Sequence, residues 1–160
     1  MRPTTLFPLL TLLAAPAVAL DSTCAIYLDA AEKSASQPAR HSISEPGDGS
    51  TLEAIYIDQR YFTTIDGKWM RMPGANLQQG EKNFVAAIRS GKYAMKACRK
   101  IGAERIDGMS TTVIAYVLEL PGTPVEETRA YIGTDGLVYR QTSGKTRVRY
   151  RYTGVRAPAL

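Results

Sequence analysis

The sequence has few of the residues from which catalytic and metal sites are usually built. Its 160 residues include two cysteines and one histidine, His41, which lies in a stretch with two prolines and two glycines. No cysteines and histidines have the spacing of metal ligands, and no serine lies in a nucleophile-elbow pattern. We therefore expect no catalytic residues, no metal and no cofactor, and we predict that the protein is not an enzyme. A hydrolase that uses only carboxylates is the weaker alternative.

Long apolar runs are also scarce, and the only one lies at the N-terminus. Arg2 precedes the apolar run 6–13, and Ala17-Val18-Ala19 has the small residues at which a signal peptidase cleaves. The run is shorter than the roughly 20 residues that a membrane-spanning helix needs. We predict that residues 1–19 form a signal peptide and that residues 20–160 form one domain. The product is expected in the periplasm, with secretion beyond the cell as the alternative.

A strong excess of one charge sign is missing as well. With Arg2 removed from the 20 basic residues, 19 remain against 15 acidic ones, which is a weak footprint for nucleic-acid binding. The stretch TRVRYRYTG, residues 146–154, places Arg147, Arg149 and Arg151 on one face of a strand. We expect these arginines to form a solvated edge or face. The functional alternative is that they bind anionic lipid headgroups, lipopolysaccharide or an acidic partner, but no nucleic acid.

The two cysteines, Cys24 and Cys98, form an even pair in a chain that carries an export signal. In an oxidising compartment such a pair favours a disulfide. The bridge would close a loop of about 75 residues and hold the start of the mature chain on the domain. Two buried free thiols are the alternative.

Hydrophobic periodicity predicts a helix, then strands, then a second helix. A series of further strands follows. Apolar residues recur at helical spacing in residues 22–36 and 81–90, and residues 37–50 have the composition of a loop. Residues 51–58 continue into the following QRYFTTI as β structure, and an Asp-Gly turn leads to residues 68–73. Later turn signals separate five further strands. These strands are expected at 93–106, 109–120, 126–133, 137–142 and 146–153.

One of these strands, STTVIAYVLEL, is apolar on both faces. Ile114 and Tyr116 point to one side, and Val113 and Ala115 point to the other. A half-solvated antiparallel strand would alternate apolar and polar residues, so both faces of the sheet are expected to be covered here. An ordinary closed core explains this pattern; a partner or an apolar ligand on one face is the alternative.

Aromatic and methionine residues indicate a candidate apolar pocket. Methionine and aromatic side chains together make adaptable apolar surfaces, although simple core packing is the commoner explanation. The candidate ligand-binding residues are Tyr56, Trp69, Met70, Met72, Ile114 and Tyr116.

Two blocks of the sequence combine turn residues with the start of a strand. The first contains Gly102, Glu104, Gly108, Thr111 and Tyr116 and leads into a long strand. The second contains Asp135, Gly136 and Leu137, followed by the basic residue Arg140. Together these blocks resemble the periplasmic LolA/LppX-like group of lipoprotein carriers.

This resemblance implies an α+β fold in which a curved antiparallel sheet, a half-barrel of about six or seven strands, carries one or two helices on its concave side. It also implies a half-size member of the group. The function that follows is non-enzymatic binding of an apolar ligand, lipid or lipoprotein segment in the cell envelope. The alternative is a module without a small-molecule ligand that binds an envelope protein through the arginine-bearing face or a sheet edge.

Overall fold

The computed structural model of the chain describes residues 20–74 and 76–160. The expected signal peptide, residues 1–19, lies outside the described residues. Within them the chain forms two helices and one nine-stranded antiparallel sheet with the order β4-β3-β2-β1-β9-β8-β7-β6-β5. Neither helix of the described part is long and apolar enough to cross a membrane.

The elements follow one another in the order helix, four strands, helix, five strands. The first half contains α1 Ser22–Ala35, β1 Ala39–Glu45, β2 Leu52–Ile57, β3 Arg60–Ile65, β4 Lys68–Arg71 and α2 Leu77–Arg89. The second half contains β5 Ala94–Ile106, β6 Met109–Glu119, β7 Glu127–Gly133, β8 Val138–Ser143 and β9 Thr146–Arg151. Strand β9 lies between β8 and β1 and so joins the two halves into one sheet.

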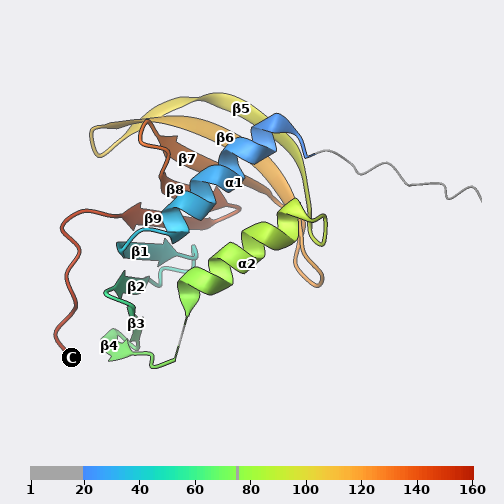
Figure 1. Cartoon of the computed structure of the whole chain (residues 1–160). Coiled ribbons are helices and arrows are strands. Elements are labelled where there is room, and N and C mark those ends of the chain that lie inside the picture. Colours follow the sequence, from blue (N-terminus) through green and yellow to red (C-terminus); the bar gives the residue numbers. More distant parts are fainter. Residues whose placement is uncertain (1–19, 75) are drawn as a thin grey trace, which may run out of the picture.

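The sheet curves around the two helices, which lie on its concave side (Figure 1). Irregular pairing accompanies this curvature, with register shifts in β5 between Lys96 and Arg99 and between Lys100 and Gly102. A third shift lies in β7 between Tyr131 and Ile132. Bulges of this kind bend a strand and increase its twist. The concave face is therefore the side on which a core can be enclosed.

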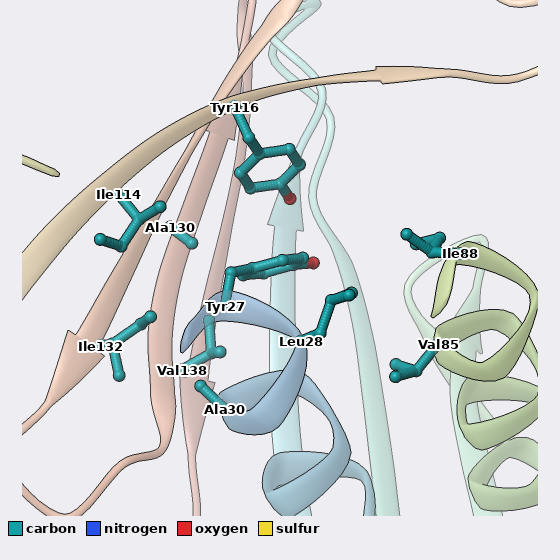
Figure 2. Packing of buried hydrophobic residues seen from close by; sticks show 10 residues of the cluster. All are labelled: Tyr27, Leu28, Ala30, Val85, Ile88, Ile114, Tyr116, Ala130, Ile132 and Val138. Atoms are coloured by element: carbon teal, nitrogen blue, oxygen red, sulfur yellow. The ribbon is translucent and has the colours of Figure 1, made fainter. Parts of the chain in front are cut away.

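Helix α1 forms the centre of the core. The Asp21 side chain accepts a hydrogen bond from the Thr23 amide and caps the first turn. Tyr27 and Leu28 are buried against the concave face, and the Tyr27 ring stacks on that of Tyr116 with 4.4 Å between centroids. The buried cluster joins both helices to β6, β7 and β8 (Figure 2).

The sheet has nine strands in the described residues, more than the six or seven expected. One extra strand is β1, which lies inside the predicted loop 37–50. The expected continuous segment from residue 51 is instead a hairpin of β2 and β3. Its turn at Asp58 and Gln59 has φ values of 50° and 60°, the conformation of a tight hairpin turn, but it lacks the glycine that usually marks one. Helix α2 also begins at Leu77, before the predicted residue 81.

Strand β6 is covered on both faces, as its composition predicts. Ile114, on the concave face, is 0% exposed, and Val113, on the outer face, is 6% exposed. Val113 pairs with Tyr131, and the Arg140 guanidinium carbon lies 4.0 Å from the centre of the Tyr131 ring. Arg140 also forms an ion pair with Glu104. The long Arg140 side chain thus covers the Tyr131 ring on the outer face while its charge remains paired.

The predicted disulfide is confirmed. Cys24 in α1 is bonded to Cys98 in β5, so the bridge joins the central helix to the edge strand of the sheet. The two residues are separated by 74 positions in the sequence.

Replacing both cysteines by alanine should lower the free energy of unfolding by about 4 kcal/mol, because the bridge limits the conformational freedom of the unfolded chain. Urea unfolding of the wild type and of the Cys24→Ala, Cys98→Ala variant measures the difference. Reducing agent should lower the stability of the wild type and leave that of the variant unchanged. A loss below about 1 kcal/mol would contradict the assignment of a stabilising bridge.

Candidate functional site

A cavity of about 450 Å³ lies between the two helices and the concave face of the sheet. Most of the surface that lines it is apolar. Its apolar walls include Leu28, Phe84, Val85, Ile88, Leu118 and Val138. We call this space the first cavity.

The first cavity exists because α2 packs mainly on α1 and not on the sheet. Val85 and Ile88 of α2 point toward Leu28 of α1 (Figure 2). α1 contacts β5, β6, β7 and β8, whereas contacts between α2 and the strands are fewer. The middle of α2 therefore forms a roof over part of the concave face.

Polar contacts hold α2 near both of its ends. At the C-terminal end, Arg89 Nη2 lies 2.5 Å from Asp29 Oδ1 in α1. At the N-terminal end, Gln78 Nε2 donates to the Gln37 carbonyl over 2.8 Å. These contacts hold α2 near its two ends. They leave the space between the middle of α2 and the sheet unfilled.

The sheet side of the first cavity carries a network of hydrogen bonds around Gln141 in β8. The Gln141 amide nitrogen donates to the Tyr27 and Tyr116 hydroxyls over 2.8 and 3.1 Å. Its amide oxygen accepts from the Tyr150 hydroxyl over 2.7 Å. Because buried polar groups without partners are costly, this network lets three tyrosines face an apolar space with their hydroxyls satisfied.

Burial also changes the acidity of these tyrosines. Loss of solvation raises the pKa of Tyr150 and raises that of Tyr116 well above the usual 10.0. Burial raises the pKa of Tyr152, which also lines the cavity, to about 12. The phenols are therefore neutral hydrogen-bonding groups at ordinary pH.

A smaller, more polar second cavity of about 220 Å³ adjoins the first. The two cavities share the side chains of Arg40, Leu77, Glu81 and Tyr150. Arg40 Nη2 of β1 lies 2.5 Å from Glu81 Oε1 of α2. Burial acts to lower the pKa of Arg40, but the ion pair with Glu81 outweighs it and the pKa is raised. A charged pair thus stands where the two cavities meet.

The structure separates the six candidate ligand-binding residues. Tyr116 lines the first cavity and Tyr56 the second. Ile114 belongs to the buried cluster beneath the helices.

The other three lie on the edge strand β4 or directly after it. Met70 and Met72 are 47% and 39% exposed. Trp69 lies on the outer face, with its ring centroid 6.3 Å from that of His41. These three residues form no common wall with Tyr116, because β4 lies at one edge of the sheet and β6 lies next to the other edge.

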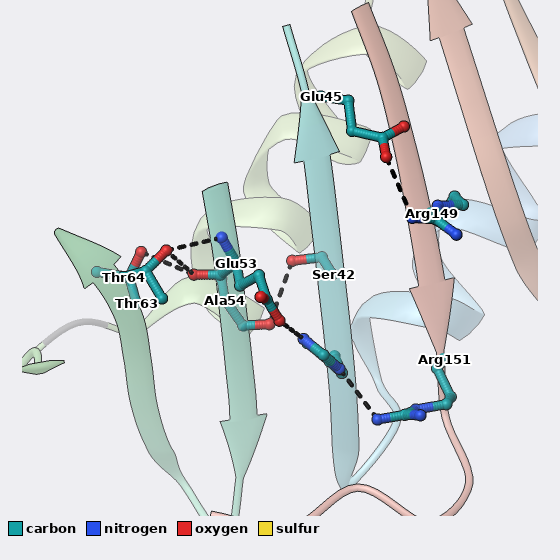
Figure 3. Close-up of polar contacts among 9 residues, drawn as sticks. Ser42, Glu45, Glu53, Ala54, Thr63, Thr64, Arg149 and Arg151 are labelled. Atoms are coloured by element: carbon teal, nitrogen blue, oxygen red, sulfur yellow. Dashed lines mark hydrogen bonds and ion pairs between the residues drawn. The ribbon is translucent and has the colours of Figure 1, made fainter. Parts of the chain in front are cut away.

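The arginines of β9 lie on the outer face, away from both cavities. Strand β9 pairs with β1 and β8, so it is not an edge strand. The exposed arginines form a face instead, which is the other arrangement that the expectation allowed. Arg149 Nη2 lies 3.2 Å from Glu45 Oε1 (Figure 3). Arg147 lies 4.0 Å from the other oxygen of the same carboxylate. The arginine charges are thus partly balanced on their own face.

His41 also lies on this outer face, in β1, and not in a solvated loop. Its Nε2 is 2.7 Å from Glu53 Oε2, and its Nδ1 is 3.2 Å from Arg151 Nη2. In residues 20–74 and 76–160, no group of three or more histidine, cysteine or acidic residues could hold a metal ion.

Sequence reasoning missed Arg40, Glu81 and Gln141. Arg40 lies in the segment that is predicted to be a loop. Its neighbours His41 and Ser42 are polar as well, so no alternation of apolar and polar residues marks Arg40 as part of a strand. Gln141 carries no local signal, because its role depends on three tyrosines that come from α1, β6 and β9.

Comparison with known proteins identifies the fold. No family model and no curated protein matches the sequence. The structure of the Mycobacterium tuberculosis lipoprotein LppX aligns with 84% of this chain and 97% of its own, with a TM-score of 0.52 and 14% identity. LprF from Mycobacterium bovis aligns with 86% of this chain and 96% of its own, with a TM-score of 0.53 and 10% identity. The chain therefore has the LolA/LppX-like fold, as the resemblance predicted.

These alignments span nearly all of the LppX and LprF chains and most of this one.

The stability of the protein should fall steeply at alkaline pH. The pKa values of Tyr116 and Tyr150 are raised in the folded chain, so the unfolded chain loses these protons first. Their contribution to stability is complete below about pH 10 and is lost as pH rises through the folded-state pKa. Above pH 10 each such tyrosine should lower the free energy of unfolding by up to about 1.4 kcal/mol per pH unit.

Urea unfolding between about pH 8 and about pH 11 measures this slope. The Tyr116→Phe variant should show a shallower slope, because one shifted phenol is removed. Equal slopes in the variant and the wild type would show that Tyr116 does not titrate as a buried group.

Proposed function

We propose that the protein binds an apolar ligand, a lipid or a lipoprotein segment in the cell envelope, and that the first cavity holds the apolar part. The observation that carries this proposal is the space of about 450 Å³ that the main hydrophobic cluster borders and that is partly open to solvent. Protein interiors are otherwise packed to the density of organic crystals. A cavity of this volume lies within the range of small-molecule sites.

Energetics favour an apolar occupant. Transfer of apolar surface from water into such a space contributes about 25 cal/mol per Å². An acyl chain would contact Phe84, Val85 and Leu118 without needing hydrogen bonds, and the tyrosine hydroxyls behind it already have partners in the Gln141 network. The walls thus need no rearrangement of polar groups to receive an apolar chain.

The fold agrees with this proposal, and so does the predicted signal peptide. The group that the sequence resembles includes carriers of lipids and lipoproteins, and the chain shares the fold of the lipoprotein LppX. A signal peptide at residues 1–19 would deliver the domain to the periplasm, where such ligands are handled. The proposal assigns no catalytic step and no cofactor.

Gly80 offers a direct test, because it lines the first cavity from within α2. Glycine in a helix interior costs about 0.5–1 kcal/mol relative to alanine. A Cβ atom built at this position meets no heavy atom within 4 Å. Close packing therefore does not require a glycine here, and a larger side chain at this position has room to extend over the first cavity.

Gly80→Phe should weaken binding of the neutral fluorescent probe N-phenylnaphthylamine by about tenfold or more, because the ring takes up part of the cavity. Gly80→Ala is the matched control; it should bind the probe like the wild type and be more stable by about 0.5–1 kcal/mol. Fluorescence titration measures the affinities. Absence of saturable binding to the wild type would contradict the proposed function.

The outer face supports a second candidate function, which is binding of an envelope protein without a small ligand. Arg147, Arg149 and Arg151 lie there side by side with partial balance from Glu45. Opposite charge on a partner would favour association with this face.

Changing all three arginines to glutamate separates the two functions. If the first cavity is the working site, the triple variant should bind N-phenylnaphthylamine as tightly as the wild type, since the arginines lie on the opposite face of the sheet. If the protein-binding candidate holds, the variant should lose an envelope protein that cross-links to the wild type in intact cells. A partner retained by the variant would count against the second candidate.

A further inference from the structure

We infer that the second cavity binds the head group of the ligand and that this head is neutral and bears hydroxyl groups, as in a monoacylglycerol. This inference rests on the proposed function, because it takes the apolar chain of the same ligand to occupy the first cavity. The two cavities adjoin at Arg40 and Glu81. The head group of an amphiphile whose chain fills the first cavity would therefore lie beside this ion pair, at the border of the second cavity.

The second cavity has the groups that a hydroxylated head requires. Ser42, Tyr56 and Tyr61 line it beside the ion pair. Each of these hydroxyls can both donate and accept a hydrogen bond. With about 30 Å³ for each water molecule in the liquid, a space of about 220 Å³ has room for about seven waters. A head the size of glycerol fits that space.

The charges in this cavity favour a neutral head over an ionic one. Arg40 and Glu81 are the only charged residues among its described lining residues, and their side chains lie 2.5 Å apart. A carboxylate head near Arg40 would also approach the negative charge of Glu81, and an ammonium head near Glu81 would approach Arg40. Hydroxyl groups can instead donate to the carboxylate and accept from the guanidinium.

The Glu81 carboxylate has an unused acceptor. Its Oε1 is bonded to Arg40, but its Oε2 is buried without a hydrogen-bond partner among the residues that the structure describes. A buried oxygen of this kind is usually paired in a working state of a protein. A hydroxyl group on the ligand would donate the missing hydrogen bond. A methyl ester or an ionised carboxylate has no hydrogen to donate.

Three competitors with the same lauroyl chain test the inference. Monolauroylglycerol, laurate and methyl laurate are each titrated against bound N-phenylnaphthylamine, below their micelle concentrations and at a pH where laurate is ionised. Monolauroylglycerol should displace the probe at about tenfold lower concentration than the other two, which corresponds to one or two additional hydrogen bonds. Equal potency of all three, or the greatest potency for laurate, would overturn the inference.

Two variants test whether the preference for monolauroylglycerol arises in the second cavity. In Glu81→Gln the charge of Arg40 is no longer balanced, so the affinity for laurate should rise relative to that for monolauroylglycerol. In the double variant Tyr56→Phe, Tyr61→Phe the preference for monolauroylglycerol should fall, while the affinity for methyl laurate stays the same. Tyr139→Phe, which lines neither cavity, is the control and should behave like the wild type.

The outcomes separate this inference from the proposed function. If the probe does not bind, or if none of the competitors displaces it, the proposed function fails and the inference fails with it. If all competitors displace the probe but neither variant changes their order, only the head-group inference is wrong. Thermal unfolding of each variant confirms that it is folded before its binding is compared.

Discussion

The position of helix α2 is the constraint on which the rest of the molecule depends. Its apolar side packs on Leu28 of α1, and its ends are held by Arg89 with Asp29 and by Gln78 with the Gln37 carbonyl. α1 in turn is fixed to the sheet by its own buried residues and by the disulfide to β5. Since α2 is carried by α1, the concave face beneath it is left partly unfilled. An apolar cavity within a folded core is the direct result.

The two faces of the curved sheet divide the chemistry between them. Strand β9 shows this division, because its Tyr150 lines both cavities while the arginines of the same strand lie on the outer face. On the concave face, Gln141 satisfies the tyrosine hydroxyls, so that an aromatic wall can adjoin apolar space. On the outer face, Arg140 pairs with Glu104 and covers the ring of Tyr131, the strand partner of Val113. The same period-two alternation therefore builds a cavity-facing side and a solvent-facing side.

Much of the fold could be predicted from the sequence, because its signals are local. Helix α1, the strands after Tyr93 and the disulfide follow from periodicity, turn residues and an even cysteine pair. The β2–β3 turn could not be predicted, since Asp58 and Gln59 adopt positive φ without a glycine. The site was predicted less well: Tyr56 and Tyr116 line the cavities, whereas Trp69 lies on the outer face. Arg40 and Glu81 are 41 positions apart, and their pairing depends on how α2 crosses the sheet, which no local pattern records.

Native mass spectrometry of the protein purified from cell envelopes without detergent tests the central claim most directly. The account predicts a chain that carries one amphiphile of lipid mass, and the same amphiphile should be depleted from the Gly80→Phe variant purified in parallel. Fragmentation of the released molecule should yield an acyl chain and a neutral, hydroxyl-bearing head. A wild-type chain that carries no small molecule, or that carries the same amount as the Gly80→Phe variant, would contradict the account.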